Sequence, residues 1–468
     1  MIMELHDYDI YPKVFPVGRQ VEITIKPLGK HVAFSGEYEL RVHRMDHGTP
    51  WTEEKCWVPK DWNTARRTVV PGEDGSLRFT YTAEAESEHY VYVYKEKKKL
   101  FRLSFYALAP DLAERIPYRG DLHVHTCRSD GHSDPATTCA YYRKLGYDFM
   151  VITDHRRYYP SLEAIKAYEG VKTGLNILPG EEVHIPQTML HIVNAGGLFS
   201  VNGLFTDKTY YSEFPSDGGN DRDTGGSLDG RRYDETIDPP EIRTPEVYNA
   251  ELDAIEKQLL EDGYPADAEP RSFAVAVWAF DKIREAGGLA IFPHPYWITS
   301  VWHENEVYTR EMMKRHPFDA FEVLGGENYY QHNGIQTALY YDEYRHGRVH
   351  AIVGSTDSHC PYDTNRNYNI CSTIVFAHEN ERADLIRSIK DGYSVAVDTI
   401  SKEYRLVGEH RLQKYAAFLM EYFYPIHDRQ AQLDGEMMRR YYVGEAAAEE
   451  VEALAKKNDE LFAKYFVR

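Results

Sequence analysis

The sequence lacks any run of about eighteen apolar residues, so a membrane-spanning helix is not expected. It also has little cysteine: the five cysteines are scattered, odd in number and form no Cys-x-x-Cys pair. This usage suits a reducing compartment better than a disulfide framework. The first residues, MIMELHDYDIYPK, contain no basic region followed by an apolar stretch, so no secretory signal is expected. We therefore expect a cytoplasmic protein.

Positive charge is scarce as well. The chain has 54 Lys and Arg residues against 74 Asp and Glu residues, and its formal net charge is −20. Such a chain repels phosphate-rich partners at long range, which disfavours binding to nucleic-acid polymers and to anionic membrane surfaces. A small phosphorylated substrate remains compatible, because metal ions in a pocket reverse the local sign of charge. The expected partner is a small molecule, and a homo-oligomer is left open.

The chain has 468 residues, too many for one compact core. The pattern of apolar and polar residues changes twice along the sequence. Residues 1–112 alternate apolar and polar side chains, as in VEITIK and LRFTYT, which predicts antiparallel strands in a small β-sandwich. Residues 401–468 carry apolar residues at helical spacing and predict a helical C-terminal segment. Neither segment shows a pattern that indicates chemistry.

Residues 113–400 alternate short apolar runs with amphipathic stretches, the pattern of buried parallel strands joined by helices. The number of units favours a barrel over an open sheet. Strands are expected over 121–124, 149–153, 176–178, 190–193, 289–292, 320–324 and 351–353. Helices are expected over 135–145, 161–168, 272–286 and 335–344. An insertion at about 196–270 contains the polar stretch GGNDRDTGGSLDGRR, which is compatible with a lid, a pocket wall or disorder.

Six of the apolar runs carry, or end on, residue types that bind metal ions. These are His123 and His125 in DLHVHT, Asp154 and His155 in FMVITDH, Glu181, Glu182 and His184 in NILPGEEVH, His191 in MLHIVNA, His294 in GLAIFPHPYW, and Asp357 and His359 in HAIVGSTDSH. In a barrel, parallel strands deliver their C-terminal residues to one face, so these side chains are expected to meet. Asp130, in the turn Ser-Asp-Gly, can return its carboxylate over the same face.

The donor types indicate which metals fit. Imidazoles and carboxylates without paired thiolates suit Zn, Mn or Fe in a catalytic site. There are more donors than one tetrahedral ion uses, so two or three ions are expected. A single histidine, or His-x-His alone, is weak evidence because most histidines are ordinary core or surface residues. The joint occurrence of these motifs, each on an apolar run, favours a metal site.

In this order the residues resemble the motifs of the PHP (polymerase and histidinol phosphatase) superfamily. The motifs stand here as HVHTCRSDG, ITDH, the histidine of FPHPYW and the DSH of STDSH, with the glutamate of GEE. The resemblance spans about residues 117–400 and implies a distorted (β/α)7 barrel, an α/β fold that holds up to three metal ions. A β-rich segment ahead of such a barrel is similar to the carbaryl-hydrolase-like (CehA/McbA) branch.

The resemblance implies nine ligands divided among three ions. The first ion takes His123, His125, Glu182 and Asp357, the second takes Glu182, His191 and His294, and the third takes Asp130, His155 and His359. Two alternatives stay open, namely Glu181 in place of Glu182 and His184 in place of His191. The Gly-x-Glu spacing from Gly180 favours Glu182, and the strand-like run favours His191.

Bridged ions lower the pKa of a shared water toward neutrality and neutralise charge that develops in the transition state. The expected activity is hydrolysis of a small phosphomonoester or phosphodiester by a metal-bound hydroxide. The alternatives are hydrolysis of a carbamate, amide or carboxylic ester at the same site, and a non-catalytic metal-binding module.

Four further residues near the motifs are candidates for the site. Arg156 is a candidate clamp for phosphate or carboxylate, and Asp154 is a candidate to orient ligands. Tyr296 and Trp297 are candidates for an apolar wall of the pocket. Each of the four also fits an ordinary loop role, so the choice is left to the structure.

Overall fold

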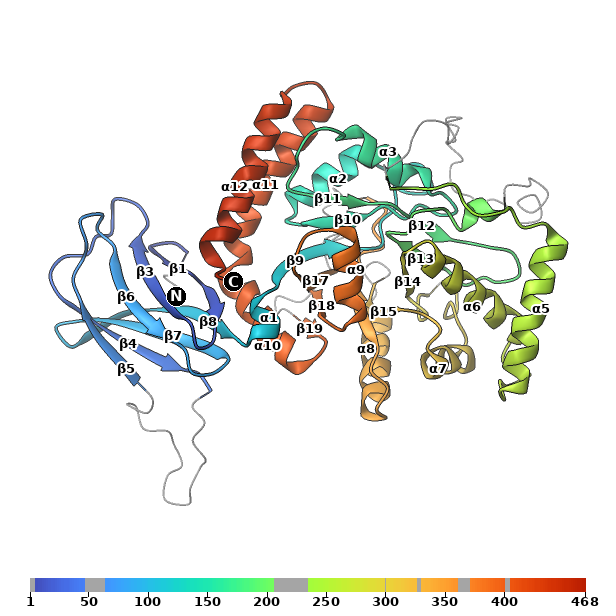
Figure 1. The fold of residues 1–468 in the computed structure, drawn as a ribbon, viewed down its shortest axis with the longest axis horizontal. Coiled ribbons are helices and arrows are strands. Elements are labelled where there is room, and N and C mark those ends of the chain that lie inside the picture. The colour runs from blue at the N-terminus through green and yellow to red at the C-terminus, as the bar shows by residue number, and fades with distance from the viewer. Residues whose placement is uncertain are drawn as a thin grey trace, which may run out of the picture. The chain divides into compact units, whose positions relative to one another are not determined.

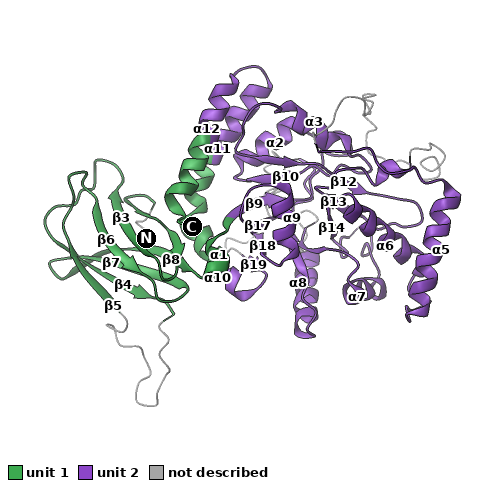
Figure 2. Cartoon of the chain, in the orientation of Figure 1, with its two compact units in different colours: residues 1–116, 414–430, 456–468 green, residues 117–413, 431–455 purple. Residues whose placement is uncertain are grey.

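The computed structural model describes residues 5–46, 64–205, 235–298, 300–325, 330–360, 371–399 and 405–468. The chain divides into two compact units, drawn green and purple in Figure 2. The first comprises residues 1–116, 414–430 and 456–468, and the second comprises residues 117–413 and 431–455. The stretch GGNDRDTGGSLDGRR and Cys56 lie outside the described residues. No helix in the described ranges is long and apolar enough to cross a membrane.

The first unit contains two sheets in the blue part of the chain, antiparallel throughout except for the parallel pair β2–β8 (Figure 1). One sheet has the order β1-β3-β6 and the other β2-β8-β7-β4-β5. The strands are β1 (Tyr8–Tyr11), β2 (Val14–Pro16), β3 (Gln20–Pro27), β4 (Tyr38–Arg44), β5 (Thr64–Val69), β6 (Leu77–Thr82), β7 (Ser87–Lys95) and β8 (Lys98–Leu108). Alternate residues are buried along β4 and β7, and Ile23, Leu40, Val91 and Leu103 share one core. The two sheets thus pack their apolar faces into one core.

The second unit contains two larger sheets, of six and five strands. The six-stranded sheet has the order β11-β10-β9-β17-β18-β19, and the five-stranded sheet the order β12-β13-β14-β15-β16. Their bounds are β9 (Ile116–Asp121), β10 (Phe149–Val151), β11 (Asn176–Leu178), β12 (Gly180–Val183), β13 (Ile192–Ala195), β14 (Leu289–Phe292), β15 (Ala320–Leu324), β16 (Ala351–Gly354), β17 (Cys371–Ala377), β18 (Ser394–Asp398) and β19 (Arg405–Val407). Leu122, Phe149, Ile291 and Val353 belong to a core shared by both sheets.

The pairing in the second unit is mixed, which corrects the expectation of uniformly parallel strands. β9, β10 and β11 are parallel, as are β14, β15 and β16, but β13 is antiparallel to both β12 and β14. The connection over residues 184–191 is too short to cross over the sheet, so β12 and β13 pair as antiparallel neighbours. Isolated bridges Val124–Ser358 and His155–Glu182 join the two sheets beyond the strand ends. The unit is mixed α/β, and a (β/α)7 barrel remains a prediction.

Seven longer helices within the described ranges accompany these sheets. α2 (Pro135–Lys144), α3 (Tyr159–Ala167), α6 (Pro270–Glu285) and α8 (Tyr330–Arg345) lie within a few residues of the expected helices, apart from the earlier start of α8. α5 (Pro245–Glu261), α7 (Glu306–Arg315) and α9 (Arg382–Lys390) were not predicted. α5 lies inside the predicted insertion and buries only Tyr248 and Leu252. With so few buried residues, α5 has only a weak apolar stripe, which is why apolar spacing did not predict it. A start signal was present, because Thr244 caps the first turn by accepting a hydrogen bond from the Val247 amide.

The predicted C-terminal helices are α10 (His410–Tyr422), α11 (Tyr424–Tyr442) and α12 (Ala448–Tyr465). Residues that predicted them by their helical spacing, including Tyr415 and Val451, are buried. α11 and α12 each contribute residues to both compact units. Within the first unit the Tyr465 hydroxyl donates to Asp9, and within the second unit Arg143 of α2 donates to Asp434 of α11. These helices are therefore integral to the two cores.

Candidate metal centre

The strand ends of the second unit place the candidate ligands on segments that meet at one site. His123 and His125 follow β9, Asp154 and His155 follow β10, and Glu182 lies within β12. His191 precedes β13, His294 follows β14, and Asp357 and His359 follow β16. The backbone locks two of these segments together, because the Asp357 amide donates to His123 O at 2.9 Å and the His125 amide donates to Ser358 O at 2.9 Å. All nine predicted ligands lie in this cluster.

The centre of the cluster is the fully buried carboxylate of Glu182. Its two oxygens lie within ion-pair distance of six imidazoles, namely His123 at 3.6 Å, His125 at 3.4 Å, His155 at 2.6 Å, His184 at 3.6 Å, His191 at 2.8 Å and His294 at 3.8 Å. Asp357 faces the same Nε2 atoms of the first two rings, 3.3 Å from His123 Nε2 and 2.9 Å from His125 Nε2. The two carboxylates thus share the imidazoles of one buried site.

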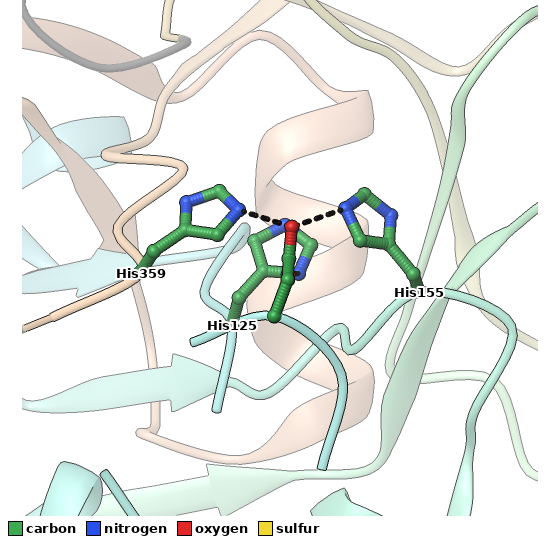
Figure 3. Close-up of side chains that lie close together, drawn as sticks. His125, His155 and His359 are labelled. Carbon is green, nitrogen blue, oxygen red and sulfur yellow. Dashed lines mark ion pairs between the residues drawn. The ribbon is translucent and has the colours of Figure 1, made fainter. Parts of the chain in front are cut away.

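A second, more open group surrounds Asp130. Its carboxylate lies 3.4 Å from His155 Nε2 and 3.2 Å from His359 Nε2, and these two ion pairs are dashed in Figure 3. The ring of His125 lies between those of His155 and His359, at 4.3 and 4.4 Å between centroids. The side chain of Asp130 is 36% exposed, whereas that of His125 is fully buried. The cluster is therefore buried around His125 and open to solvent on the side of Asp130.

The turn that carries Asp130 is built for close approach. The Gly131 amide donates to Thr126 O at 2.8 Å, and a Cβ added at Gly131 would lie 2.7 Å from His125 O. No larger residue fits this position without a shift of the backbone. The Asp154 carboxylate holds the same turn, accepting from the Thr126 amide at 2.8 Å and from the Thr126 and Ser129 hydroxyls. Asp154 thus positions the turn and is not among the clustered ligand atoms.

The donor atoms fall into four overlapping groups, each compact enough to hold one ion. The groups are His125, Asp130, His155 and His359; His155, Glu182, His184 and His191; His123, Glu182 and His294; and His123, His125 and Asp357. Among the described residues, the buried His123 Nε2, both ring nitrogens of His125 and both oxygens of Glu182 have no hydrogen-bond partner. Buried polar atoms without partners are costly and uncommon, so the residues fit a bound cation.

The charge state of the carboxylates also fits a cation. Burial by itself raises the pKa of Glu182, but His155, His191 and His123 lower it well below its usual value. Burial likewise raises the pKa of Asp357, and His123 and His125 lower it far below the ordinary range. Both groups are therefore anionic at neutral pH, the state in which carboxylates bind metals.

The two alternatives left open by the sequence have different outcomes. Glu181 and Glu182 point to opposite sides of β12, because side chains alternate along a strand. The Glu181 carboxylate accepts hydrogen bonds from the Ser200 hydroxyl at 2.7 Å and the Asn202 amide at 2.9 Å, and it lies outside the cluster. His184 and His191 both lie in the cluster, 4.2 Å apart between ring centroids. His184 and His191 are therefore both placed to act as donors, and neither replaces the other.

The remaining candidates differ in how close they lie to the cluster. The Arg156 amide donates to Glu182 O at 2.9 Å, and its backbone has a φ of 59°, a left-handed conformation that side-chain-bearing residues seldom adopt. Trp297 lies against the rings of His191 and His294, at 5.9 and 5.8 Å between centroids. Tyr296 is buried and donates its hydroxyl to Glu306 at 2.7 Å. Of the two aromatic residues, Trp297 is the one that borders the metal-ligand cluster.

Sequence reasoning missed two residues of this site, Glu322 and His303. Glu322 lies in the middle of β15, fully buried, with one oxygen 3.0 Å from His123 Nδ1. Its signal was present in the sequence as a lone acidic residue within the apolar run AFEVL. The ring of His303 lies 4.6 Å from that of His191. His303 follows no apolar run, so no pattern marked it.

We expect Glu322→Gln to lower the affinity for Zn²⁺ or Mn²⁺ and kcat/KM by about 10- to 100-fold, with little change in thermal stability. The carboxylate orients the His123 ring so that Nε2 faces Glu182 and Asp357, and the neutral amide binds the Nδ1 proton more weakly. Calorimetric metal titration and steady-state kinetics measure both effects. Glu311→Gln, which alters a carboxylate paired with Arg315 on α7, serves as the control. Unchanged metal affinity in the Glu322 variant would rule out this positioning role.

Comparison with known proteins found no matching family model and no matching curated sequence. Among solved structures, a two-domain protein from Bacteroides vulgatus that contains a predicted PHP-like metal-dependent phosphoesterase is 15% identical, with a TM-score of 0.37, over 62% of this chain and 67% of that one. A protein from Bifidobacterium adolescentis is described as a metal-dependent phosphoesterase by inference. It is 20% identical with a TM-score of 0.30, and the match covers 51% of this chain and 87% of that one. An amidohydrolase from Chromobacterium violaceum, with bound sulfate and no metal, is 15% identical with a TM-score of 0.27. The match covers 52% of this chain and 88% of that one. These similarities assign neither a reaction nor a substrate to this chain.

Proposed function

We propose that the chain is a metal-dependent hydrolase of the PHP type that acts on a small phosphomonoester or phosphodiester. The supporting observation is the buried Glu182, whose two oxygens face six imidazoles and have no hydrogen-bond partner in the part of the chain that the structure describes. Structural metal sites close their coordination with protein donors, whereas this cluster is open on the side of Asp130. An open set of imidazoles and carboxylates is the arrangement that metal-assisted hydrolysis needs.

The metal ligands we propose are the nine residues of the sequence prediction, with His184 as a tenth. The donor types fit Zn, Mn or Fe, and the four groups provide room for two or three ions. Ions bound there supply Lewis acidity, which lowers the pKa of water and neutralises negative charge on the reacting group. The surrounding residues fix the donors. Glu322 orients His123, and the Asp121 carboxylate accepts from the His123 amide at 3.2 Å.

The open side of the cluster determines the direction from which a substrate arrives. Asp130, His155 and His359 keep part of their side chains exposed, whereas His123 and His125 are fully buried. Hydrolysis there joins the oxygen of water to phosphorus, breaks the bond to the leaving oxygen and transfers one proton to that oxygen. The phosphoryl oxygens would be held on the exposed side, where the cation-binding donors converge.

A second candidate function is hydrolysis of a carbamate, amide or carboxylic ester at the same site. It is supported by the net charge of −20 and by the absence of Lys and Arg from the described residues that line the neighbouring cavity. Dianionic phosphate groups are usually held by such cations. With either bond, we propose a small-molecule substrate, a cytoplasmic location and no nucleic-acid polymer as partner.

A substrate screen separates the two reactions. The full chain is loaded with Mn²⁺ or Zn²⁺ and assayed with p-nitrophenyl phosphate, bis-p-nitrophenyl phosphate and p-nitrophenyl acetate. We expect metal-dependent release of p-nitrophenolate from a phosphate ester and a metal content above one equivalent. Turnover of the acetate alone would instead support acyl chemistry. A chain that binds less than one equivalent of metal and turns over no ester would contradict both functions.

A further inference from the structure

A cavity of about 780 Å³ borders the metal-ligand cluster. Its walls come from residues 187–189, from the start of α6 and from residues 301–306. His303 belongs both to this wall and to the edge of the cluster, with its ring 4.6 Å from His191 and 5.9 Å from His294 between centroids. Its amide donates to Trp297 O at 2.7 Å, which ties this wall to the loop after His294. The cavity and the cluster therefore lie side by side, with His303 in the wall between them.

The apolar part of the wall consists of side chains that would ordinarily avoid water. Met189 is 75% exposed, Val301 71% and Trp302 42%, and all three line the same cavity. Apolar groups gathered in one hollow mark a binding surface more often than scattered ones do. The indole of Trp302 packs edge-on against the Tyr296 ring at 5.2 Å, which holds it in place. This wall suits a ligand with apolar carbon atoms.

The polar part of the wall is acidic. Glu304 is 7% exposed, lines the cavity and makes no hydrogen bond through its carboxylate among the described residues. Its one ion-pair neighbour in that part of the chain is His303 Nε2, at 3.8 Å. Burial, together with the charge of Glu269, raises the pKa of Glu304 to about 8. The free carboxyl is therefore largely protonated at pH 7, and a ligand that brings a positive charge would favour its ionised form and pair with it.

The other two carboxylates of the wall differ from Glu304. Glu306 is already neutralised, because Arg310 Nε lies 2.8 Å from one oxygen and the Tyr296 hydroxyl donates to the other. Glu269 accepts a hydrogen bond from the Asn305 amide at 2.9 Å and has no Lys or Arg partner among the described residues. A phosphate or carboxylate group would be repelled here, and a cation would be attracted.

We propose that this cavity binds the organic group of the substrate and selects an ammonium group attached to apolar carbon, with Glu304 as the counter-ion and Trp302 as the aromatic face. An ammonium group over an indole ring gains from the negative charge on the ring face. The inference rests on the proposed function, since it names the class of substrate that the same site would hydrolyse. The substrate class is an amine- or quaternary-ammonium-bearing ester.

Binding without turnover is the first test. Choline and its neutral isostere 3,3-dimethylbutan-1-ol are titrated by calorimetry into the full chain and into three variants. We expect the wild-type chain to bind choline about tenfold more tightly than the alcohol, and Glu304→Gln and Trp302→Ala each to lose most of that preference. Glu306→Gln makes the same change in charge in the same cavity and is expected to retain the preference. Equal binding of the two probes, or an unchanged preference in Glu304→Gln, would overturn the proposal.

Turnover then separates this inference from the proposed function. The p-nitrophenyl phosphodiesters of choline and of 3,3-dimethylbutanol differ only in the charged nitrogen. We expect a kcat/KM about tenfold higher for the choline diester, carried mainly by KM, and a reduced ratio in Glu304→Gln. Hydrolysis of both diesters at equal rates would overturn the cavity proposal and leave the hydrolase function standing. Selective choline binding without hydrolysis of either diester would support the cavity and contradict the phosphoesterase function.

Discussion

Replacing Glu182 with Gln is expected to remove most of the bound metal and to lower kcat/KM by at least about a thousandfold. Glu182 is the carboxylate that contacts six imidazoles and belongs to two of the four donor groups. The amide has the same size but carries no charge, so a cation loses its central anionic partner. Metal ions contribute several kcal/mol to hydrolysis, and each 1.36 kcal/mol corresponds to about a factor of ten in rate. The loss should therefore exceed that of any substitution outside the cluster.

The neighbouring residue provides a matched control. Glu181→Gln makes the same chemical change one position along β12, where the carboxylate accepts hydrogen bonds from Ser200, Asn202 and Asn194 outside the cluster. We expect this variant to keep its metal content and its activity within a few fold, and to lose stability by about 1.5–3 kcal/mol because charge-assisted hydrogen bonds are weakened. The two variants thus distinguish a metal ligand from a buried structural carboxylate.

Two measurements decide this comparison. Metal content after reconstitution with Zn²⁺ or Mn²⁺ is determined by mass spectrometry, and thermal unfolding is followed with and without the ion. A ligand that binds only the folded chain raises the midpoint of unfolding, so the wild type and Glu181→Gln should show a shift that Glu182→Gln lacks. A Glu182→Gln variant that retains a full complement of metal would refute the ligand assignment, as would loss of metal from Glu181→Gln alone.

Replacing Arg143 with Met is expected to lower the free energy of unfolding of the second unit by about 3–5 kcal/mol. Arg143, on α2, is fully buried between two acids, 2.7 Å from Asp434 on α11 and 2.9 Å from Asp148. Removal of the guanidinium leaves two buried carboxylates without their cation. Burial already raises the pKa of Asp434 despite the opposing charge of Arg143, so the unpaired acid would be costly in its ionised form.

Lys144→Met is the control for this substitution. Lys144 is the next residue on α2, and its ammonium pairs with Glu436 at 3.0 Å, but both side chains are more than one-third exposed. Exposed pairs contribute about 0–1 kcal/mol, so the variant should unfold close to the wild type. Urea unfolding followed by circular dichroism measures the difference. Equal midpoints for the two variants would show that the buried pair makes no net contribution.

Much of the metal centre could be predicted from the sequence because its ligands follow short apolar runs. A run such as FMVIT is buried as a strand wherever the strand lies in the sheet, and its end carries Asp154 and His155 with it. The alternation of apolar residues likewise determined the strands of the sandwich, and helical spacing determined α10 to α12. These patterns are local, and each depends only on a strand or helix burying one face.

Other parts of the site depend on contacts between distant segments, which no local pattern records. One strand that was expected to be parallel, β13, pairs antiparallel with β14. The packing of β15 places Glu322 against His123. The cavity beside the cluster combines Met189 with Trp302 and Glu304, which come from two separate loops. Sequence spacing cannot bring such residues together, because loop conformation is decided by the surface against which the loop packs.

By itself, then, the sequence determined which residue types stand at the ends of the buried strands, and hence that imidazoles and carboxylates would gather without thiolates. The tertiary structure decided which of two adjacent glutamates faces them, that His184 joins His191, and that a buried acid and an exposed indole share the cavity beside them. The physical reason is that burial of an apolar run is a property of the run. The direction and neighbours of each polar side chain, in contrast, are set by strand pairing and by the packing of segments far apart in the chain.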